Sequence, residues 1–313
     1  MKRAFVFPGQ GSQAVGMGKD LAEAHVHARE VFEEVDDALS QSLTRIMFEG
    51  PEDKLTLTEN AQPALMAVSL AVVRVIEREG GRFLAELADF VAGHSLGEYS
   101  ALAAVQALSL TDTARLLKIR GQAMQKAVPV GEGAMAVLLG IDIDDADEIA
   151  AQAAEDGVCS AANDNAPGQV VVSGDLLAVE RAMALAKDQG AKRAMLLPVS
   201  APFHCALMEP AAREMEHVLA DANIAKPTLP VISNVTARAV VEPEEIRRRL
   251  VEQVTGTVRW RESMLHLGAQ DVDELVELGA GKVLGGLAKR IDRSFNAQSL
   301  GTPDTVEVFL KSL

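Results

Sequence analysis

The chain has 313 residues, 48% of them hydrophobic and 24% charged, which is the usage of a folded globular protein and excludes a disordered one. The 30 basic and 45 acidic side chains give a formal net charge of −15, which argues against nucleic acid or an anionic membrane surface as a partner. The two cysteines are too few for a disulfide framework, and no apolar stretch is long enough for a signal segment or a membrane span, so we expect a cytoplasmic protein.

Short apolar runs alternate with longer helical patterns through most of the chain. Such alternation predicts an α/β domain, similar to the α/β hydrolases, whose parallel sheet is covered by helices on both faces. The elements predicted for this large domain are a strand at 4–7, an acidic helix within 20–38, a helix at 64–79, a strand at 90–92, helices at 98–107 and 111–126, a helical pattern at 213–222, a strand at 231–233, a helix at 243–253, a strand at 275–278 and a helix at 283–291.

The pattern changes between about residues 134 and 198, where the predicted order is strand, helix, strand, strand, helix, strand. This order is that of the ferredoxin-like split unit, so we predict a small domain at 130–198 inserted into a discontinuous large domain formed by 1–129 and 199–313. The predicted elements are strands at 135–139, 158–162, 170–173 and 194–199, and helices at 144–155 and 176–189.

The clearest local motif is the G-x-S-x-G of residues 93–97, Gly-His-Ser-Leu-Gly. It follows the strand predicted at 90–92 and opens a helix, which is the context of a nucleophile elbow. In this interpretation Ser95 is a nucleophile, and the start of the helix places free N–H groups beside its oxygen. The alternative is an ordinary glycine-rich strand-to-helix turn with a capping serine, because the short pattern alone has low specificity.

A nucleophilic serine needs a general base, and histidine is the usual one. The segment 200–205, Ser-Ala-Pro-Phe-His-Cys, is rich in turn residues and follows a predicted strand, so His204 is the candidate and His266 stays open. Cys205 beside His204 suggests a Cys–His pair, with a buried thiol as the simpler interpretation. The other histidines are assigned to the surface or, for His94, to a side chain that points away from the serine: His25, His27, His94 and His217.

The loop at 7–13, Phe-Pro-Gly-Gln-Gly-Ser-Gln, allows two interpretations. Gly9, Gly11 and Ala14 fit the G-x-G-x-x-G/A pattern of a dinucleotide site, but no second strand ending in an acidic residue follows about 20 positions later. We therefore favour a loop of N–H donors that faces the elbow and forms half of an oxyanion hole. Metal-binding and P-loop motifs are missing from the sequence, so neither a metal nor a cofactor is expected.

Taken together, the segments 7–13, 93–98 and 203–204 resemble the motifs of the malonyl-CoA:acyl carrier protein transacylases of fatty acid synthesis, which are related to polyketide acyltransferase domains. The resemblance runs over the whole chain in the family's order and includes the inserted small domain. The segments 119–124, Ile-Arg-Gly-Gln-Ala-Met, and 251–260 agree with it as well. Several motifs at matching spacing make the resemblance specific, although each motif alone does not.

The resemblance implies a covalent serine mechanism. Ser95 matches the family's nucleophile and His204 its base. The main-chain N–H groups of Leu96 and Gln10 match the oxyanion hole, and the carbonyl of Gln253 matches the group that orients the histidine in place of a carboxylate.

The resemblance also implies how the substrate is recognised. Arg120 matches the residue that binds the malonyl carboxylate, and Phe203 matches the form that selects malonyl over methylmalonyl groups. Asn165, in the stretch 163–169, matches a loop that lines the cleft between the domains. For Arg120 a structural ion pair with one of the many carboxylates is the alternative.

The expected partners are malonyl-CoA and the phosphopantetheine arm of an acyl carrier protein, with no nucleic acid and no membrane, and we expect a monomer. Carrier proteins of this kind are acidic, so docking on a chain of charge −15 needs a local basic patch. Two patches are candidates: Lys282, Lys289, Arg290 and Arg293 in the large domain, and Lys187, Lys192 and Arg193 in the small one.

Two other functions share these motifs. A serine hydrolase or thioesterase has the same elbow and base, but normally orients the base with an Asp or Glu that lies between them in the chain. A non-catalytic acyl-binding protein would keep the glycines and lose Ser95, His204 or Arg120, all of which are present.

Overall fold

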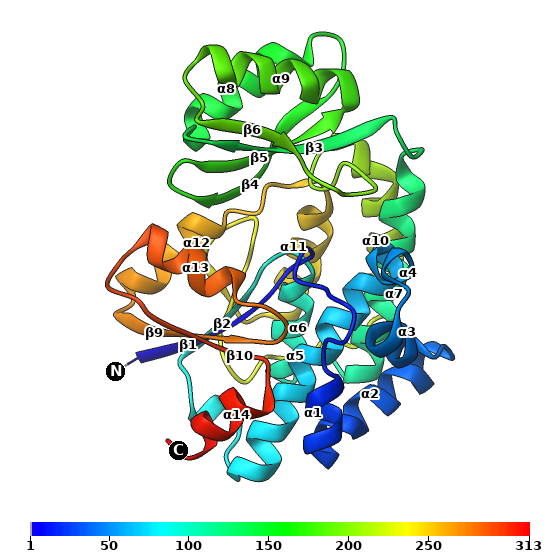
Figure 1. Cartoon of the computed structure of the whole chain (residues 1–313), viewed down its shortest axis with the longest axis vertical. Coiled ribbons are helices and arrows are strands. Elements are labelled where there is room, and N and C mark those ends of the chain that lie inside the picture. The colour runs from blue at the N-terminus through cyan, green and yellow to red at the C-terminus, as the bar shows by residue number, and fades with distance from the viewer. Residues whose placement is uncertain (1) are drawn as a thin grey trace.

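The computed structural model describes residues 2–313, and its largest sheet has six strands in the order β10-β9-β1-β2-β7-β8 (Figure 1). All neighbouring strands are parallel except β7 and β8, which form an antiparallel pair. The strands of this sheet are β1 (Lys2–Phe7), β2 (Phe90–Gly93), β7 (Val231–Ile232), β8 (Ala239–Val240), β9 (Val272–Leu278) and β10 (Asn296–Leu300).

Helices cover both faces of this sheet, and the alternation of side chains along β1 explains why. Phe5 and Phe7 point into the main core, whereas Ala4 and Val6 point into a second core on the opposite face. A strand that is buried on both faces reads as a continuous apolar run, as β1 does. The helices that contribute to the main core are α1 (Lys19–Ala24), α2 (Val26–Leu39), α3 (Leu43–Glu49), α4 (Glu52–Thr56), α5 (Thr58–Gly80), α6 (Leu96–Ala104), α7 (Leu110–Ala127), α10 (Glu209–Ala220), α11 (Pro243–Thr255) and α14 (Pro303–Leu310), and those of the second core are α12 (Trp260–Ala269) and α13 (Val283–Ile291).

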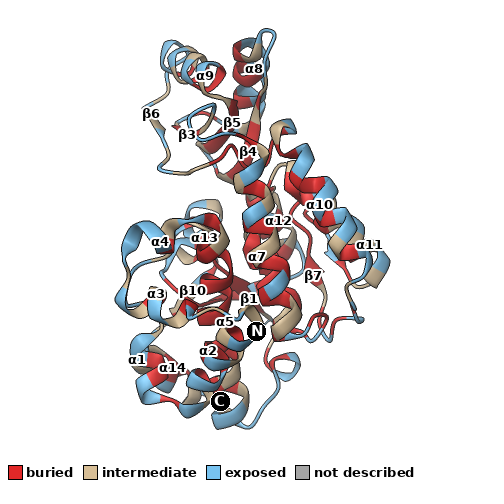
Figure 2. Cartoon of the chain, turned by 90° about the vertical axis from the view of Figure 1, so that its right-hand side faces the viewer, coloured by how far each residue is buried: buried red, intermediate tan, exposed pale blue. Residues whose placement is uncertain are grey.

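The second sheet is antiparallel, with four strands in the order β4-β5-β3-β6, and two helices cover one of its faces (Figures 1 and 2). Ala136 and Leu138 face these helices, whereas Met135 and Val137 face the main core of the large domain. The expected order strand, helix, strand, strand, helix, strand is therefore present. Its elements are β3 (Gly133–Leu139), α8 (Ile143–Ala154), β4 (Cys159–Ala166), β5 (Gln169–Asp175), α9 (Leu176–Asp188) and β6 (Arg193–Leu196).

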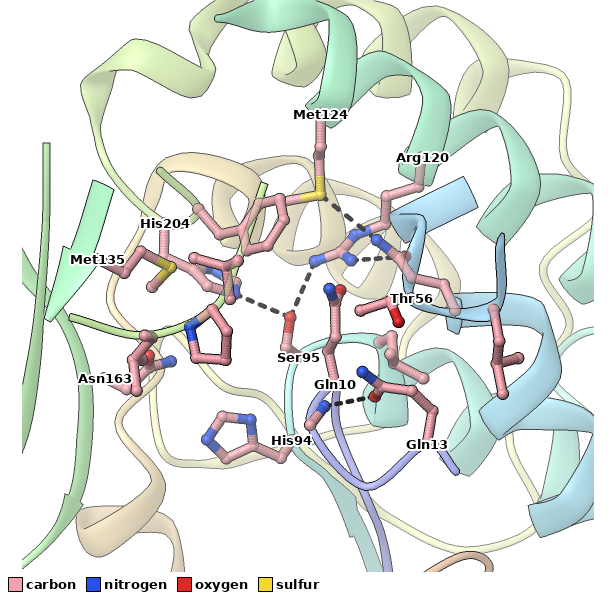
Figure 3. Close-up of a pocket in the computed structure, with 18 of the residues that line it drawn as sticks. Gln10, Gln13, Thr56, His94, Ser95, Arg120, Met124, Met135, Asn163 and His204 are labelled. Atoms are coloured by element: carbon pink, nitrogen blue, oxygen red, sulfur yellow. Dashed lines mark hydrogen bonds between the residues drawn. The ribbon is translucent and has the colours of Figure 1, made fainter. Parts of the chain in front are cut away.

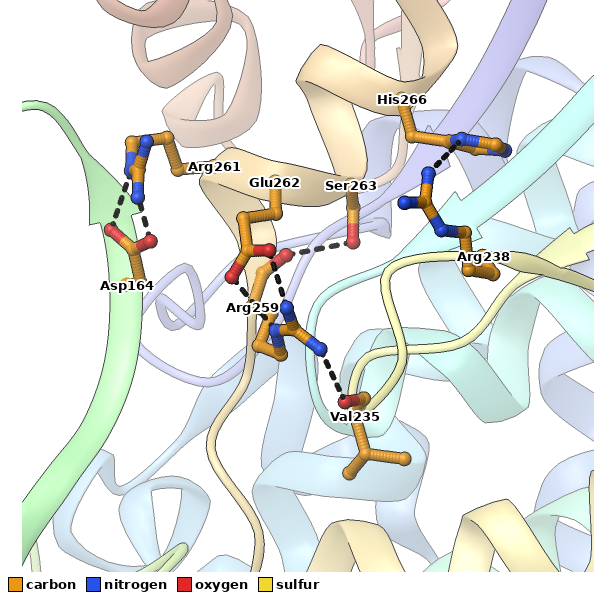
Figure 4. Close-up of polar contacts among 8 residues, drawn as sticks. All are labelled: Asp164, Val235, Arg238, Arg259, Arg261, Glu262, Ser263 and His266. Carbon is orange, nitrogen blue, oxygen red and sulfur yellow. Dashed lines mark hydrogen bonds and ion pairs between the residues drawn. The ribbon is translucent and has the colours of Figure 1, made fainter. Parts of the chain in front are cut away.

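The small sheet is joined to the large domain along the outer edge of β4. Val258, just before α12, donates its N–H to the Ala162 carbonyl at 2.9 Å and accepts from the Asp164 N–H at 3.0 Å. Next to this bridge the buried carboxylate of Asp164 pairs with Arg261 of α12 at 2.9 Å (Figure 4). These contacts fix the edge of the small sheet to α12 and to the residues just before it.

Several predicted elements need correction. The strand predicted at 158–162 continues to Ala166, because pairing with Val258 and β5 overrides the low strand propensity of the Asn-Asp-Asn stretch. The strand predicted at 194–199 ends at Leu196. The acidic helix within 20–38 is two helices, interrupted at His25, whose backbone is extended. The polar edge strand β10 and the helix α14 were not foreseen from the sequence, and no helix in residues 2–313 has the length and apolarity needed to cross a membrane.

Candidate active site

Ser95 lies at a sharp turn between β2 and α6, in a backbone conformation with φ 54° and ψ −111°. A non-glycine residue in this region costs on the order of 1–3 kcal/mol and is typical of functional positions. The flanking glycines are required by close packing: a Cβ on Gly93 would lie 1.8 Å from the Gly97 carbonyl oxygen, and one on Gly97 would lie 2.3 Å from that of Phe7. The turn therefore has the geometry of a nucleophile elbow.

His204 contacts the serine directly (Figure 3). Its Nε2 lies 2.8 Å from Ser95 Oγ, and its Nδ1 lies 2.8 Å from the main-chain carbonyl oxygen of Gln253. Since a carbonyl can only accept, Nδ1 carries the proton and Nε2 is left to accept from the serine hydroxyl. His266 lies elsewhere, against Arg238 (Figure 4), and so does not reach the serine.

Burial sets the protonation state of His204. The side chain is only 4% exposed, and desolvation, followed by the positive charge of Arg120, lowers its pKa to about 3. The imidazole is therefore neutral at physiological pH and can take up a proton from Ser95. No carboxylate among residues 2–313 contacts its Nδ1, so the arrangement differs from a Ser-His-Asp triad.

Arg120 reaches the serine from α7, on the other side from His204 (Figure 3). Its side chain is 1% exposed, and Nη2 donates to Ser95 Oγ at 3.1 Å and to Gln253 Oε1 at 2.9 Å. Nη1 donates to Gln62 Oε1 at 2.8 Å, and Nε has no partner within residues 2–313. Within residues 2–313 no carboxylate forms a salt bridge with this guanidinium, so Arg120 does not form the structural ion pair that was the alternative interpretation.

Gln253 links the nucleophile, the base and the arginine. Its main-chain oxygen accepts from His204, and its side-chain Oε1 accepts from Arg120. Its side-chain Nε2 donates to the carbonyl of Ser95 at 3.0 Å and to Glu98 Oε2 at 2.7 Å. Asn234 supports the same group: its Oδ1 accepts from the Ser95 N–H at 2.7 Å and its Nδ2 donates to the Gly93 carbonyl at 2.7 Å. These bonds fix the elbow from α11 and from the turn that follows β7.

Glu98 and Asn234 were missed as site residues in the sequence. Glu98 directly follows the elbow motif, and burial raises its pKa to about 7 although Asn234, Gln253 and Arg120 oppose the shift. Asn234 directly follows the strand predicted at 231–233, and polar residues at the carboxyl ends of parallel strands are a known signal for sites. Gln62 was missed too, because it stands outside every motif and its partner Arg120 lies 58 positions away in the chain.

The N-terminal loop faces the elbow. Gln10 lines the cavity in front of Ser95, and its side chain contacts Thr58 at 3.4 Å. Within residues 2–313 neither the Gln10 N–H nor the Leu96 N–H donates a hydrogen bond, so both donors are free for a ligand. The segment about 20 residues later is helical, as expected, which leaves the dinucleotide interpretation without its second strand.

A cavity of about 420 Å³ opens in front of Ser95, and Phe203 is among its walls. Asn163 of β4 lines it, whereas Asn165, the residue expected there, does not. Asn165 Oδ1 instead lies 2.8 Å from His94 Nε2, so it contributes by holding the His94 ring. The other lining residues are Gln10, Gly11, Gln13, Ala14, Glu52, Leu55, Thr56, Gln62, His94, Ser95, Leu96, Arg120, Met124, Met135, Leu197, Pro198, Val199 and His204.

The cysteine near the base is not paired with it. Cys205 Sγ donates to the Pro202 carbonyl at 3.2 Å, away from His204, and burial raises the pKa of this thiol. Cys159 is also buried, and desolvation raises its pKa to about 12. Both cysteines stay protonated at physiological pH, so neither is a nucleophile here.

An elbow serine, a neutral histidine and an unpaired arginine at one cavity define an acyl-transferring or acyl-hydrolysing site, and sequence comparison separates the two. The acyl transferase domain family matches residues 4–288, and the chain belongs to this family.

Within the family the chain is similar to malonyl transferases. It is 45% identical to the malonyl CoA-acyl carrier protein transacylase of Bacillus subtilis, over 100% of this chain and 97% of that protein. The crystal structure of an acyl-carrier-protein-S-malonyltransferase from Bartonella henselae is 57% identical and superposes with a TM-score of 0.97, covering 100% and 99% of the two chains. A malonyl-transacylase in complex with a type II PKS acyl-carrier protein is 41% identical, with a TM-score of 0.96 and full coverage of both chains.

Proposed function

We propose that the protein transfers a malonyl group from malonyl-CoA to the phosphopantetheine thiol of an acyl carrier protein through a malonyl ester on Ser95. The observation that carries the proposal is the convergence of two groups on one oxygen: His204 Nε2 at 2.8 Å and Arg120 Nη2 at 3.1 Å from Ser95 Oγ. The first group activates an attacking hydroxyl, and the second binds an acyl group that ends in a carboxylate. The names of the relatives support the same substrate and acceptor.

In the first half-reaction His204 Nε2 takes the Ser95 proton while Oγ attacks the thioester carbonyl carbon. The negative charge that develops on the carbonyl oxygen is stabilised by the free N–H groups of Gln10 and Leu96, the latter at the start of α6. As the C–S bond breaks, the imidazolium returns the proton to the leaving thiolate of CoA. The Gln253 carbonyl, bonded to Nδ1, holds the ring in the required tautomer throughout.

The second half-reaction repeats these steps in reverse. His204 deprotonates the carrier's pantetheine thiol, the thiolate attacks the malonyl ester, and the proton returns to Ser95 Oγ. Since the thiol of CoA and the thiol of the carrier are chemically alike, the second half-reaction is the first in reverse, and one base with one orientation serves both.

Arg120 is placed to recognise the acyl group. In a malonyl ester the carboxylate is two bonds from the ester carbonyl carbon, so a guanidinium in contact with Oγ can reach it after a small movement of either group. A free carboxylate would also supply the negative partner that Arg120 lacks. An acetyl group supplies none, which gives a physical basis for selecting malonyl-CoA.

A serine hydrolase or thioesterase is the second candidate, because it uses the same elbow and base. The carbonyl of Gln253 on His204 Nδ1, where such enzymes carry a carboxylate, favours the transferase. The pathway, fatty acid or polyketide synthesis, depends on the carrier served. The domain boundaries at 129/130 and 198/199, the cytoplasmic location and the monomeric state stay predictions.

Intact mass spectrometry after mixing the protein with malonyl-CoA tests the proposal. We expect the wild type to gain the mass of one malonyl group and Ser95→Ala to gain none. A half-buried serine of β4 that does not line the cavity, Ser160→Ala, is not needed for the adduct and serves as the control for the substitution itself. If no acyl-CoA modifies the wild type, the covalent mechanism is wrong.

A further inference from the structure

The Arg120 guanidinium is held in place by neutral groups alone. Two amide oxygens, Gln62 Oε1 at 2.8 Å and Gln253 Oε1 at 2.9 Å, accept from its two terminal nitrogens, and the third acceptor is the Ser95 hydroxyl. A cation with 1% exposure is normally paired with a carboxylate, because burying an unpaired charge is costly. The arrangement therefore fixes the direction of the guanidinium without neutralising its charge.

Gln62 is the member of this pair with no other assigned task. It lies on α5, is 1% exposed and lines the cavity, whereas Gln253 also orients His204 through its main chain. The Gln62 Nε2 donates to Met124 Sδ at 3.6 Å, so the amide spans one turn of α7, from Arg120 to Met124. A guanidinium can only donate and a thioether can only accept. The Gln62 oxygen therefore faces Arg120 and its nitrogen faces Met124.

We propose that Gln62 is a specificity-determining residue for acyl groups that end in a carboxylate: its neutral oxygen aims Arg120 and leaves the positive charge for the substrate. The inference rests on the proposed function, in which Arg120 receives the malonyl carboxylate. A carboxylate at position 62 would form a bidentate pair with the guanidinium and compete with the substrate for it. Glutamine is isosteric with glutamate, so the difference lies in charge and not in shape.

The other titratable groups that face Arg120 do not provide this competing carboxylate. Glu98 reaches it through the Gln253 amide, and burial raises the pKa of Glu98 to about 7, so a part of this carboxyl is protonated at neutral pH. The Tyr99 ring lies 5.6 Å from the guanidinium carbon, and burial raises the pKa of its hydroxyl to about 12. His204, on the far side of Ser95, is neutral.

The test compares kcat/KM for malonyl-CoA and acetyl-CoA, with pantetheine as the acceptor, in Gln62→Glu, Gln62→Met and wild-type protein. We expect Gln62→Glu to lower kcat/KM about 100-fold for malonyl-CoA, mainly through KM, and to change it by less than about threefold for acetyl-CoA. Gln62→Met removes the acceptor without adding charge and should lower the malonyl value about tenfold. Gln152→Glu, the same change on the exposed surface of α8, should leave both values unchanged.

The ratio of the two kcat/KM values decides the outcome. If Gln62→Glu lowers both values equally, Gln62 has a structural role and the inference is wrong. If Gln62→Glu lowers neither value, Gln62 does not select the acyl group and the inference is wrong as well. If Gln62→Glu does not fold, the ratio in Gln62→Met decides in the same way. Arg120→Ala is measured alongside, so that failure of the proposed role of Arg120 can be told from failure of the role of Gln62. An unchanged ratio in Arg120→Ala overturns the role of Arg120 itself. A changed ratio in Arg120→Ala, with an unchanged ratio in both Gln62 variants, overturns only the role of Gln62.

Discussion

The large and the small sheet meet at one cavity but contribute to it in different ways. The large sheet brings a strained serine, a buried histidine and a buried arginine to the carboxyl end of β2, where Ser95 Oγ contacts both of the other side chains. The small sheet has an alternating apolar pattern with a core of its own, and its contributions to the cavity are wall residues such as Met135 and Asn163. We infer that the chemistry belongs to the large sheet and that the small sheet shapes access and excludes water.

The difference explains which parts of the molecule tolerate change. In the small sheet each buried apolar side chain has one task, which is to pack on α8 and α9 or on the main core. Around Ser95 single residues have several tasks: Gln253 contacts the base, the arginine, the serine carbonyl and Glu98. Substitutions there should change activity out of proportion to their size.

The largest effect is expected from the base. His204→Ala should slow acylation by malonyl-CoA about 10²–10⁴-fold, the range for a positioned acid–base group, as measured by stopped-flow or quenched-flow mass analysis. His266→Ala is the matched control and should acylate at the wild-type rate, since His266 contacts Arg238 and not the serine. Normal acylation in His204→Ala, or a comparable loss in His266→Ala, would mean that the base is misassigned.

Arg120→Ala should fold and should lose malonyl transfer about 10²–10³-fold, on the order of a truncated buried charge pair. The same variant should gain activity with acetyl-CoA relative to malonyl-CoA, because no buried cation is left without a partner. Arg120→Lys should restore little, since a point charge on a flexible stem cannot reproduce a fixed fork. Unfolding of Arg120→Ala in circular dichroism, or equal losses with both substrates, would assign Arg120 to structure.

Glu98 should make stability depend on pH. Its pKa is about 7 in the folded protein against 4.5 in the unfolded one, so the unfolded state ionises first as the pH rises. The free energy of unfolding contributed by Glu98 is therefore greatest below pH 4.5 and falls until about pH 7. Between pH 5 and pH 8 the free energy of unfolding of the wild type should fall by about 2 kcal/mol relative to that of the isosteric variant Glu98→Gln, as measured by urea titration.

The control for this measurement is Glu148→Gln on the exposed surface of α8, which should follow the wild type at every pH. A constant difference between wild type and Glu98→Gln across the range would show that Glu98 does not titrate as its burial requires.

The smallest effect concerns carrier docking, and it compares the two domains directly. Lys289 and Arg290 are exposed on α13, and Arg290 contacts Gln169 at the β4–β5 turn, so this patch borders the small sheet. Charge reversal at both should raise the apparent KM for an acidic carrier several-fold at low salt and leave KM for malonyl-CoA unchanged. The same reversal at Lys187 and Lys192 tests the small-domain patch; an equal effect on both substrates would argue against docking at the reversed patch.

The sequence predicted the parts of the site that depend on local motifs. The elbow, the turn-rich loop with His204 and the helix with Arg120 each lie in a recognisable segment, and the alternation of strands and helices predicted both sheets. Asn234 and Gln62 could not be assigned in this way, because their partners are 139 and 58 positions away in the chain. The same holds for the end of β4, where pairing with Val258 makes a strand of the polar sequence Asn-Asp-Asn.

The fate of the malonyl-enzyme tests the central claim, transfer rather than hydrolysis, most directly. The acylated protein is separated from malonyl-CoA and followed by intact mass in buffer and in buffer containing a pantetheine thiol. We predict that the malonyl adduct persists in buffer and is lost rapidly to the thiol, with malonyl-pantetheine as the product. Loss at the same rate in both solutions, with free malonate as the product, would contradict the account and identify a hydrolase.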